Sequence, residues 1–280
     1  MNTIQLLEEG SIKLKQKNIL SHRIDSELLL SKVLKSNREK MLINLRKEIS
    51  PIFVKKYFKL IERRSCKEPI AYILNEKEFW SKSFFVNKHT LVPRPETELL
   101  VDKLVKEYKD KSISILDIGT GSGCILISLL SELKNSKGVG LDVSKEALKV
   151  AKFNAKKLGL SRKIKFVNSP LMEIFGKKFD LIVSNPPYIK RKDIKNLECD
   201  IKNFEPKIAL DGGNDGLDVV RKVIYKTKII LKKNGMLAIE IGNEQYKKVS
   251  KILLRNNFRT KYVIKDFRDN IRCILSTLKA

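Results

Sequence analysis

The sequence predicts an α/β protein whose larger part is a doubly wound, mostly parallel sheet and whose first part is a small all-α domain. Two observations carry this prediction. Apolar residues recur at helical spacing in the first quarter of the chain, and short apolar strands alternate with helices in the last two thirds. A chain of 280 residues is long enough for two modest domains. We therefore expect a helical bundle over residues 1–74, a β-hairpin linker over 75–94 and the sheet domain over 95–280.

The bundle is predicted from the spacing of its apolar residues. Those assigned to the first helix are Ile4, Leu7, Ile12 and Leu14, and those assigned to the second are Leu28, Leu29, Leu30, Val33 and Leu34. Ser50 followed by Pro51 offers an N-cap and a proline at the first helical position, which opens a further helix. Pro69 ends this region.

The linker is predicted to be extended from Phe79 to Val92. The apolar run 84–86 lies on one side of a turn expected near Asn87, and residues 91–92 lie on the other. We interpret this stretch as a hairpin between the two domains.

The sheet domain is predicted to contain seven strands with helices between them. The expected strands are Ser114–Ile118, Gly138–Asp142, Ile164–Val167, Leu181–Ser184, Met236–Ile241, a strand around Tyr262–Ile264, and Arg272–Leu275. The expected helices include Ser144–Leu158, Asp218–Leu231 and Glu244–Asn256.

Composition excludes several classes of protein. No apolar run approaches the ~18 residues of a membrane-spanning helix, and no signal peptide is recognisable, so we expect a cytoplasmic protein. With only His22 and His89, mechanisms that need several histidines are nearly excluded. The four cysteines form no C-x-x-C pair, so we expect no metal site and no disulfide, but reduced and mostly buried thiols.

The charge balance raises the question of a nucleic-acid partner, because 58 Lys and Arg against 32 Asp and Glu give a net charge of +26. Residues 1–90 carry 19 basic and 10 acidic side chains, and residues 91–280 carry 39 and 22, so the excess is spread along the chain. Of the cations 45 are Lys, whereas Arg is preferred for bidentate recognition of phosphates and bases. We prefer a compositional origin, typical of an AT-rich genome, and consider a nucleic-acid substrate unlikely.

A glycine-rich loop follows the first predicted strand of the sheet and precedes a helix. Its residues run from Asp117 to Gly123 in the pattern D-x-G-x-G-x-G. The spacing of a dinucleotide-binding loop fails, because Cys124 stands where that pattern needs its last glycine. Glycines let the backbone turn tightly and approach a ligand closely. The loop resembles the first motif of S-adenosylmethionine-dependent methyltransferases, and the alternative is a glycine-rich turn without a ligand.

Asp142 closes the next predicted strand, 23 positions after Gly119. An acidic side chain at this place can accept hydrogen bonds from the ribose hydroxyls of a nucleoside. Its alternative is a helix N-cap beside Ser144, and the two roles can coexist.

The run Asn185-Pro186-Pro187-Tyr188 directly follows a third predicted strand, at the edge of the sheet where ligands bind. Two prolines remove backbone donors and fix φ, so the turn presents rigid carbonyl acceptors beside the Asn185 side chain. Such acceptors suit a substrate NH₂ group, since holding its N–H bonds can orient the nitrogen toward an electrophilic methyl. Tyr188 could form an aromatic wall that also favours a sulfonium charge. The alternative is a proline-rich loop without a function.

Together these motifs resemble the amino-group methyltransferases that share N-P-P-Y, whose targets include adenine in DNA, guanine in RNA and glutamine in proteins. Further blocks are similar to those of the peptide chain release factor N5-glutamine methyltransferase family. They are Glu68–Leu74, Glu78–Trp80, Leu91–Glu98, Phe204-Glu205-Pro206, Ala209-Leu210, Gly212-Gly213, Asp215-Gly216-Leu217 and Glu240-Ile241-Gly242. This resemblance implies a Rossmann-like class I methyltransferase domain with an antiparallel last strand.

The resemblance also implies the reaction and the residues that serve it. The methyl of S-adenosylmethionine would go to the side-chain amide of the glutamine in the Gly-Gly-Gln motif of class 1 release factors, leaving S-adenosylhomocysteine. The residues carried over for the cofactor are Asp117, Gly119, Thr120, Gly121, Ser122, Gly123, Asp142, Pro170 and Asn185. Those carried over for the glutamine are Asn185, Pro186, Pro187 and Tyr188, of which Asn185, Pro186 and Tyr188 are the catalytic candidates. The bundle would recognise the protein substrate, and we expect a monomer.

Two positions depart from the family's pattern. Ser169-Pro170 replaces the usual acidic and apolar pair after the third strand, which leaves the adenine contacts unassigned. Asn75 replaces a glycine, a mild change because Asn tolerates positive φ. Two alternatives stay open: the same transfer to another glutamine, such as one in a ribosomal protein, or to an amino group of a nucleic acid; and a cofactor-binding or ribosome-associated protein without catalysis.

Overall fold

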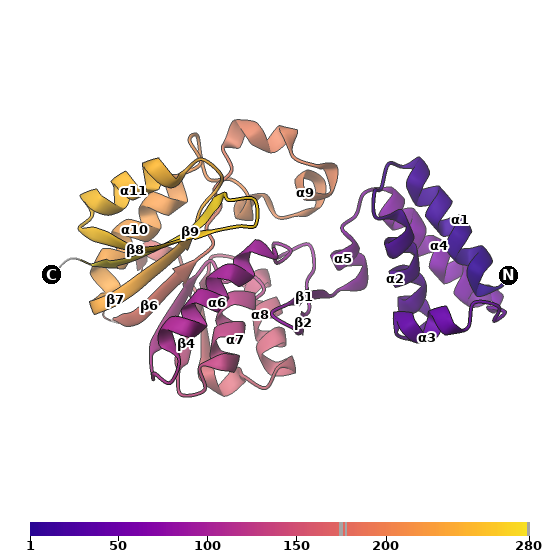
Figure 1. Ribbon diagram of the computed structural model, residues 1–280, viewed down its shortest axis with the longest axis horizontal. Coiled ribbons are helices and arrows are strands. Elements are labelled where there is room, and N and C mark those ends of the chain that lie inside the picture. Colours follow the sequence, from indigo (N-terminus) through magenta and orange to yellow (C-terminus); the bar gives the residue numbers. More distant parts are fainter. Residues whose placement is uncertain (174–175, 177, 279–280) are drawn as a thin grey trace. The chain divides into compact units, whose positions relative to one another are not determined.

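The computed structural model describes residues 1–173, 176 and 178–278 (Figure 1). The chain divides into two compact units. The smaller unit comprises Met1–Glu76 with Glu198–Phe204, and the larger comprises Lys77–Leu197 with Glu205–Ala280. In the part of the chain that the structure describes, no helix has both the length and the apolar character needed to cross a membrane.

The smaller unit is all-helical, as predicted. Its helices are α1 (Thr3–Gln16), α2 (His22–Leu34), α3 (Arg38–Ile43), α4 (Pro51–Ser65), α5 (Ile70–Leu74) and α9 (Cys199–Phe204). Pro51 opens α4 after Ser50, as the sequence indicates. Asn75 has a φ of 56° at the end of α5, which agrees with the conformation expected for a position where glycine is usual.

The buried face of α1 differs from the face that apolar spacing indicated. Ile4 and Ile12 are 40% and 56% exposed, whereas Gly10 is buried. A Cβ at Gly10 would lie 1.9 Å from the Tyr57 hydroxyl, so α1 and α4 approach each other where α1 has no side chain. Apolar spacing therefore predicts the helix but not its buried face, because that face is formed partly by small and polar residues.

The hairpin is present, and a turn begins at Asn87, where the Thr90 N–H donates to the Asn87 carbonyl over 3.0 Å. This turn does not join the strands of the hairpin. Strands β1 (Lys77–Phe79) and β2 (Lys82–Phe84) pair antiparallel, and Trp80 and Ser81 form the turn with φ of 53° and 51°. A two-residue turn of this type is usually marked by Asn-Gly or Asp-Gly. Trp80-Ser81 lacks that signal, so the turn that joins β1 and β2 could not be predicted from the sequence.

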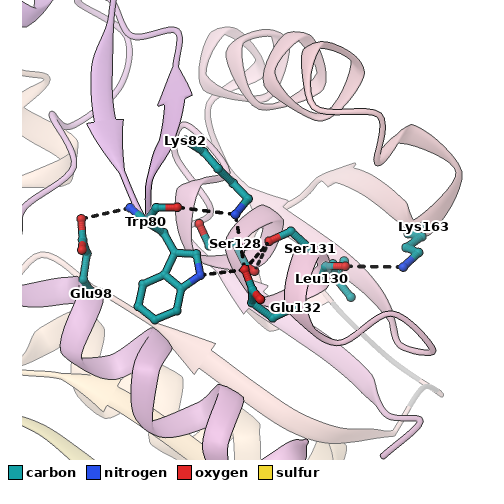
Figure 2. Close-up of polar contacts among 8 residues, drawn as sticks. All are labelled: Trp80, Lys82, Glu98, Ser128, Leu130, Ser131, Glu132 and Lys163. Atoms are coloured by element: carbon teal, nitrogen blue, oxygen red, sulfur yellow. Dashed lines mark hydrogen bonds and ion pairs between the residues drawn. The ribbon is translucent and has the colours of Figure 1, made fainter. Parts of the chain in front are cut away.

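Polar contacts from two helices of the larger unit hold this turn in place (Figure 2). The Trp80 backbone N–H donates to Glu98 Oε1 over 3.0 Å, and the indole N–H donates to Glu132 Oε1 over 3.0 Å. Lys82 Nζ lies 3.4 Å from the same Glu132 oxygen. These contacts therefore reach the turn from α6 and α7, which are distant from it in sequence.

The sheet has seven strands in the order β5-β4-β3-β6-β7-β9-β8, and β9 is antiparallel to its neighbours. Its strands are β3 (Ser114–Ile118), β4 (Lys137–Asp142), β5 (Ile164–Asn168), β6 (Phe179–Ser184), β7 (Leu231–Glu240), β8 (Phe258–Lys265) and β9 (Ile271–Leu278). Its helices are α6 (Glu96–Tyr108), α7 (Cys124–Glu132), α8 (Lys145–Lys157), α10 (Asp218–Ile230) and α11 (Tyr246–Arg255), with short 3₁₀ helices η1 (Ser161–Lys163), η2 (Leu171–Glu173), η3 (Arg191–Asn196) and η4 (Lys207–Ala209). All seven predicted strands, the three named helices and the antiparallel last strand are confirmed.

Helices cover both faces of this sheet (Figure 1). Alternate residues of one strand enter different cores: Ile115 packs in the cluster that contains α6 and α7, and Leu116 packs in the cluster that contains α10 and α11. This burial on both sides explains the nearly continuous apolar runs of the central strands. It also leaves their carboxyl ends as the edge where a ligand can reach the sheet.

The four cysteines are free thiols, but they are not mostly buried as expected. Cys66 and Cys199 are exposed, whereas Cys124 is half-buried and Cys273 is buried. Cys66 lies at the end of α4 and Cys199 begins α9, so each stands at a helix terminus instead of on an inner face.

Candidate active site

A cavity of about 430 Å³ lies at the carboxyl edge of the sheet in the larger unit. The ends of β3, β4 and β6 contribute Ile118, Asp142 and Asn185 to its lining. Other residues from the sequence motifs in its lining are Gly119, Thr120, Gly121, Ser122, Ser169, Pro170 and Pro187. The structure thus brings the three sequence motifs, 117–123, 142 and 185–188, to one place.

The glycine-rich loop turns tightly between β3 and α7. The backbone N–H groups of Gly119 and Thr120 both donate to the Leu141 carbonyl over 2.9 Å, which ties the loop to the end of β4. Gly119 and Gly121 have φ of 73° and 54°, and a Cβ on Gly119 would meet no atom within 4 Å. The backbone is therefore open toward the cavity at these positions, as close approach of a ligand requires.

Asp117 lies beneath this loop and is outside the residues that line the cavity. Its Oδ2 accepts a hydrogen bond of 2.7 Å from the Thr120 hydroxyl, and its buried Oδ1 has no hydrogen-bond partner among the described residues. Burial raises the pKa of Asp117 to about 7, and the charge of Asp142 adds to this effect. Asp117 is therefore connected to the loop through Thr120, and its assignment to the cofactor stays a prediction.

Asp142 connects the loop to the next helix. Its Oδ2 accepts from the Gly121 backbone N–H and its Oδ1 accepts from the Ser144 backbone N–H, each over 2.9 Å. Ser144 itself caps α8 by accepting from the Ala147 N–H. Burial raises the pKa of Asp142. Each carboxylate oxygen can accept a second hydrogen bond, so the proposed contact with a ribose hydroxyl is compatible with these bonds.

The N-P-P-Y turn begins where β6 ends. Asn185 and Pro187 line the cavity, whereas Pro186 and Tyr188 are absent from the described lining residues. A Cβ built on Gly242 would lie 3.0 Å from the Tyr188 ring. Burial raises the pKa of Tyr188 to about 12, so its hydroxyl stays protonated at neutral pH. The roles assigned to Pro186 and Tyr188 stay predictions.

Gln245 holds the backbone of this turn from behind. Its side-chain amide donates to the carbonyls of Tyr188 and Gly216 over 2.9 and 3.2 Å, and its Oε1 accepts from the Gly242 N–H over 2.9 Å. Three chain segments therefore meet at one buried amide, which fixes the path of the turn.

The segment around Arg94 forms another wall of the cavity, which the sequence left without a function. Arg94 Nη2 donates to Glu205 Oε1 over 2.7 Å, and the Val92 N–H donates to Glu205 Oε2 over 3.3 Å. Both residues fall in blocks with a family resemblance, but a contact across 111 positions carries no signal in a single sequence.

The sequence analysis assigned no role to Asn154. It is fully buried in α8, donates to the carbonyls of Phe85 and Ser122, and accepts from the Phe85 N–H over 2.8 Å. It therefore ties the glycine loop to the segment after the hairpin. A signal existed, since Asn154 is a polar residue on the otherwise apolar inner face formed by Ala147, Val150 and Ala151.

Two protein-family models match parts of this chain. Residues 5–74 match the PrmC N-terminal domain, and residues 94–201 match the methyltransferase small domain. The release factor glutamine methyltransferase of Clostridium acetobutylicum is 39% identical over 267 residues, which are 94% of each chain. The bifunctional methyltransferase of Rickettsia felis is 38% identical over 97% of this chain, and this chain spans only 57% of its length.

The fold also matches a solved structure. The ribosomal protein L11 methylase of Lactobacillus delbrueckii subsp. bulgaricus aligns with a TM-score of 0.53 and 19% identity, over 70% of this chain and 84% of that one. At this identity the likeness concerns the fold alone.

Proposed function

The chain belongs to the release factor glutamine methyltransferase family, and from this premise we propose that it methylates the side-chain amide of the glutamine in the Gly-Gly-Gln motif of class 1 release factors. The observation that carries the proposal is the shared cavity. Asn185, which suits an amide substrate, lines the same 430 Å³ space as the glycine loop and Asp142, which suit a nucleoside cofactor.

The residues present fit S-adenosylmethionine as the methyl donor. The open backbone at Gly119 and Gly121 leaves room for close approach, and Asp142 stands where ribose hydroxyls can donate. Pro170 and Leu171 offer an apolar surface on which a flat base can pack. When bound, S-adenosylmethionine supplies an electrophilic methyl on a sulfonium whose departure leaves the neutral thioether of S-adenosylhomocysteine.

Asn185 and the Pro186 carbonyl are proposed to accept the two N–H bonds of the substrate glutamine. These contacts orient the nitrogen lone pair along the line of the methyl transfer, so the acceleration comes from proximity and orientation. The N–C bond forms as the S–C bond breaks, and the amide nitrogen then loses a proton to water. We assign no general base, and Tyr188, with its raised pKa, does not serve as one.

The smaller unit is proposed to recognise the release factor. Its match to the PrmC N-terminal domain supports this assignment. Several large apolar side chains are exposed on this unit, namely Leu20, Ile24, Ile43 and Ile52.

Methyl transfer to a purified release factor tests the proposal. We expect label from methyl-labelled S-adenosylmethionine to enter the wild-type factor and to be lost when its Gly-Gly-Gln glutamine is changed to Ala. Label that persists in the altered factor would contradict the proposal. Duplex DNA, ribosomal RNA and ribosomal proteins serve as alternative acceptors in the same assay, and preferential labelling of any of them would also overturn it.

A further inference from the structure

A buried carboxylate stands behind the N-P-P-Y turn, and the transfer described above does not use it. Glu240 ends β7 and is 3% exposed. Thr97, in the first turn of α6, is 2% exposed, and its hydroxyl donates to Glu240 Oε2 over 2.7 Å. Asn185 Nδ2 in turn donates to Thr97 Oγ1 over 3.4 Å. A chain of hydrogen bonds thus runs from Glu240 through Thr97 to the wall of the cavity.

The direction of this chain is determined by its first member. Burial raises the pKa of Glu240 to about 7. Above that pH the ionised carboxylate only accepts hydrogen bonds, so the single proton of the Thr97 hydroxyl is committed to Glu240. Thr97 Oγ1 can then only accept from Asn185. An Asn185 amide turned by 180° would place its oxygen against a Thr97 oxygen that has no proton left to donate.

The orientation of the Asn185 amide decides what the cavity can bind. Thr97 accepts one N–H of the Asn185 amide, and Asn185 also forms a hydrogen bond with the Glu240 side chain, so the NH₂ group faces these two residues and the side-chain oxygen is left for a ligand. An oxygen accepts from an N–H bond, whereas it repels the oxygen of a carboxylate or a carbonyl. A reversed amide would present two donors instead and would favour those oxygens.

We propose that Thr97 and Glu240 are positioning residues that hold the Asn185 amide with its oxygen toward the substrate, so that the site selects a group with N–H bonds over a carboxylate. This inference rests on the proposed function for the identity of the substrate, but the orientation of the amide does not depend on that identity. A site rejects an analogue of its substrate strongly when binding that analogue would leave a buried polar group of the site without a hydrogen-bond partner. A carboxylate would leave the Asn185 oxygen in this position.

The first test compares two substitutions at one position. Thr97→Val keeps the shape of the side chain and removes the hydroxyl, whereas Thr97→Ser keeps the hydroxyl. With a release factor as substrate, we expect Thr97→Val to lower kcat by about 10- to 100-fold, the range seen when groups that orient a binding ligand are removed. The Kd for S-adenosylhomocysteine should change less than about twofold, and Thr97→Ser should restore most of the rate. Equal effects of Val and Ser, or parallel losses in kcat and cofactor affinity, would overturn the proposal.

The second test needs no substrate. In ¹⁵N-resolved spectra of the full chain, the Asn185 side-chain NH₂ signals are identified by their loss in Asn185→Ala. Their exchange with solvent should be slow in the wild type and in Thr97→Ser, and at least about tenfold faster in Thr97→Val. Unchanged exchange in Thr97→Val would overturn the proposal even if release-factor methylation is observed. If the wild type fails to methylate release factors, the proposed function fails, and slow exchange that depends on the hydroxyl would still support the positioning residues.

Glu240→Gln provides an independent variant in case Thr97→Val does not fold. A glutamine amide can donate to Thr97, which frees the hydroxyl proton to face Asn185 and permits the reversed amide. We expect a lower kcat, with the same small change in Kd for S-adenosylhomocysteine and faster exchange of the Asn185 NH₂. If Glu240→Gln kept the wild-type kcat and the wild-type exchange rate of the Asn185 NH₂, the proposed direction of the hydrogen bonds would be contradicted.

Discussion

Arg94 and Glu205 are paired at the wall of the cavity, with Arg94 Nη2 2.7 Å from Glu205 Oε1. The Glu205 side chain is only 2% exposed, so its negative charge is stabilised by contacts inside the protein, of which the Arg94 guanidinium is one. Glu205→Gln should lower the free energy of unfolding by about 1–3 kcal/mol, since it weakens a charge-assisted bond to a buried acceptor. It should also weaken binding of S-adenosylhomocysteine, because the segment at Arg94 lines the site.

Urea unfolding followed by the fluorescence of Trp80, the single tryptophan, measures this change in the larger unit. The matched control is Asp102→Asn, which removes the exposed Lys106–Asp102 pair of α6. Such surface pairs contribute at most about 1 kcal/mol. Similar losses in the two variants would show that burial of Glu205 does not matter.

Asn154→Ala should destabilise the larger unit by at least about 1–3 kcal/mol. It leaves the part-buried N–H and carbonyl of Phe85 and the buried contact at the Ser122 carbonyl without this partner. One buried unpaired group alone costs about 1–3 kcal/mol. Urea unfolding followed by Trp80 fluorescence measures the decrease in the free energy of unfolding. Calorimetric titration with S-adenosylhomocysteine measures the accompanying loss of affinity. Lys152→Ala, at an exposed position of the same helix, should stay within about 0.5 kcal/mol of the wild type.

Asp117→Asn should change how stability depends on pH. Burial raises the pKa of Asp117 to about 7 from an ordinary value of 3.8, so the folded state binds its proton more tightly than the unfolded state does. The resulting stabilisation is complete below pH 3.8 and is lost as the pH rises through 7. The wild type should therefore lose up to about 1.4 kcal/mol per pH unit more than Asp117→Asn across this window.

Urea midpoints measured between pH 4 and 8 test this difference. The pKa of Glu240 is also raised to about 7 by burial, so Asp117→Asn should keep part of the slope. Asp110→Asn, at an exposed position, provides the control. If the stability of the wild type and that of Asp117→Asn changed in parallel with pH, the raised pKa of Asp117 would be refuted.

Gly10→Ala should destabilise the smaller unit, although Ala in a helix interior normally stabilises by about 0.5–1 kcal/mol relative to Gly. The added Cβ would lie 1.9 Å from the Tyr57 hydroxyl, and overpacking of this kind costs about 1–3 kcal/mol. Hydrogen exchange of the α1 and α4 amides reports on this unit alone. Lys15→Ala, exposed on the same helix, is the control, and slower exchange in Gly10→Ala would contradict the close approach.

Asn185→Ala should lower kcat for release-factor methylation far more than it lowers cofactor affinity. Its amide is proposed to orient the substrate nitrogen for transfer, and about 10²- to 10³-fold is typical when one such hydrogen-bonding group is removed. Single-turnover rates and the Kd for S-adenosylhomocysteine separate the two effects. Equal losses in both would argue against the acceptor role.

The sequence was sufficient for the parts of the fold that depend on local pattern. Strands such as β3 and β6 are buried on both faces and stand between clear turn signals, so both their existence and their ends could be predicted. The glycine loop, Asp142 and Asn185 could be placed at one edge because carboxyl ends of neighbouring parallel strands meet there.

Features that depend on tertiary contacts escaped prediction. The turn at Trp80 and Ser81 is held by Glu98 and Glu132 from other elements, so its own residues carry no signal. Gly10 faces the core because Tyr57 approaches it, which apolar spacing cannot reveal.

The positions of the four thiols bear on how the protein can be labelled. A maleimide requires an accessible thiolate, and only Cys66 and Cys199 are exposed. Burial raises the pKa of Cys124 to about 12, so the thiol beside the cavity resists alkylation under the same conditions. Fluorophores can therefore be attached to the natural chain at two surface points, and cofactor and release-factor binding can be followed spectroscopically without an engineered cysteine.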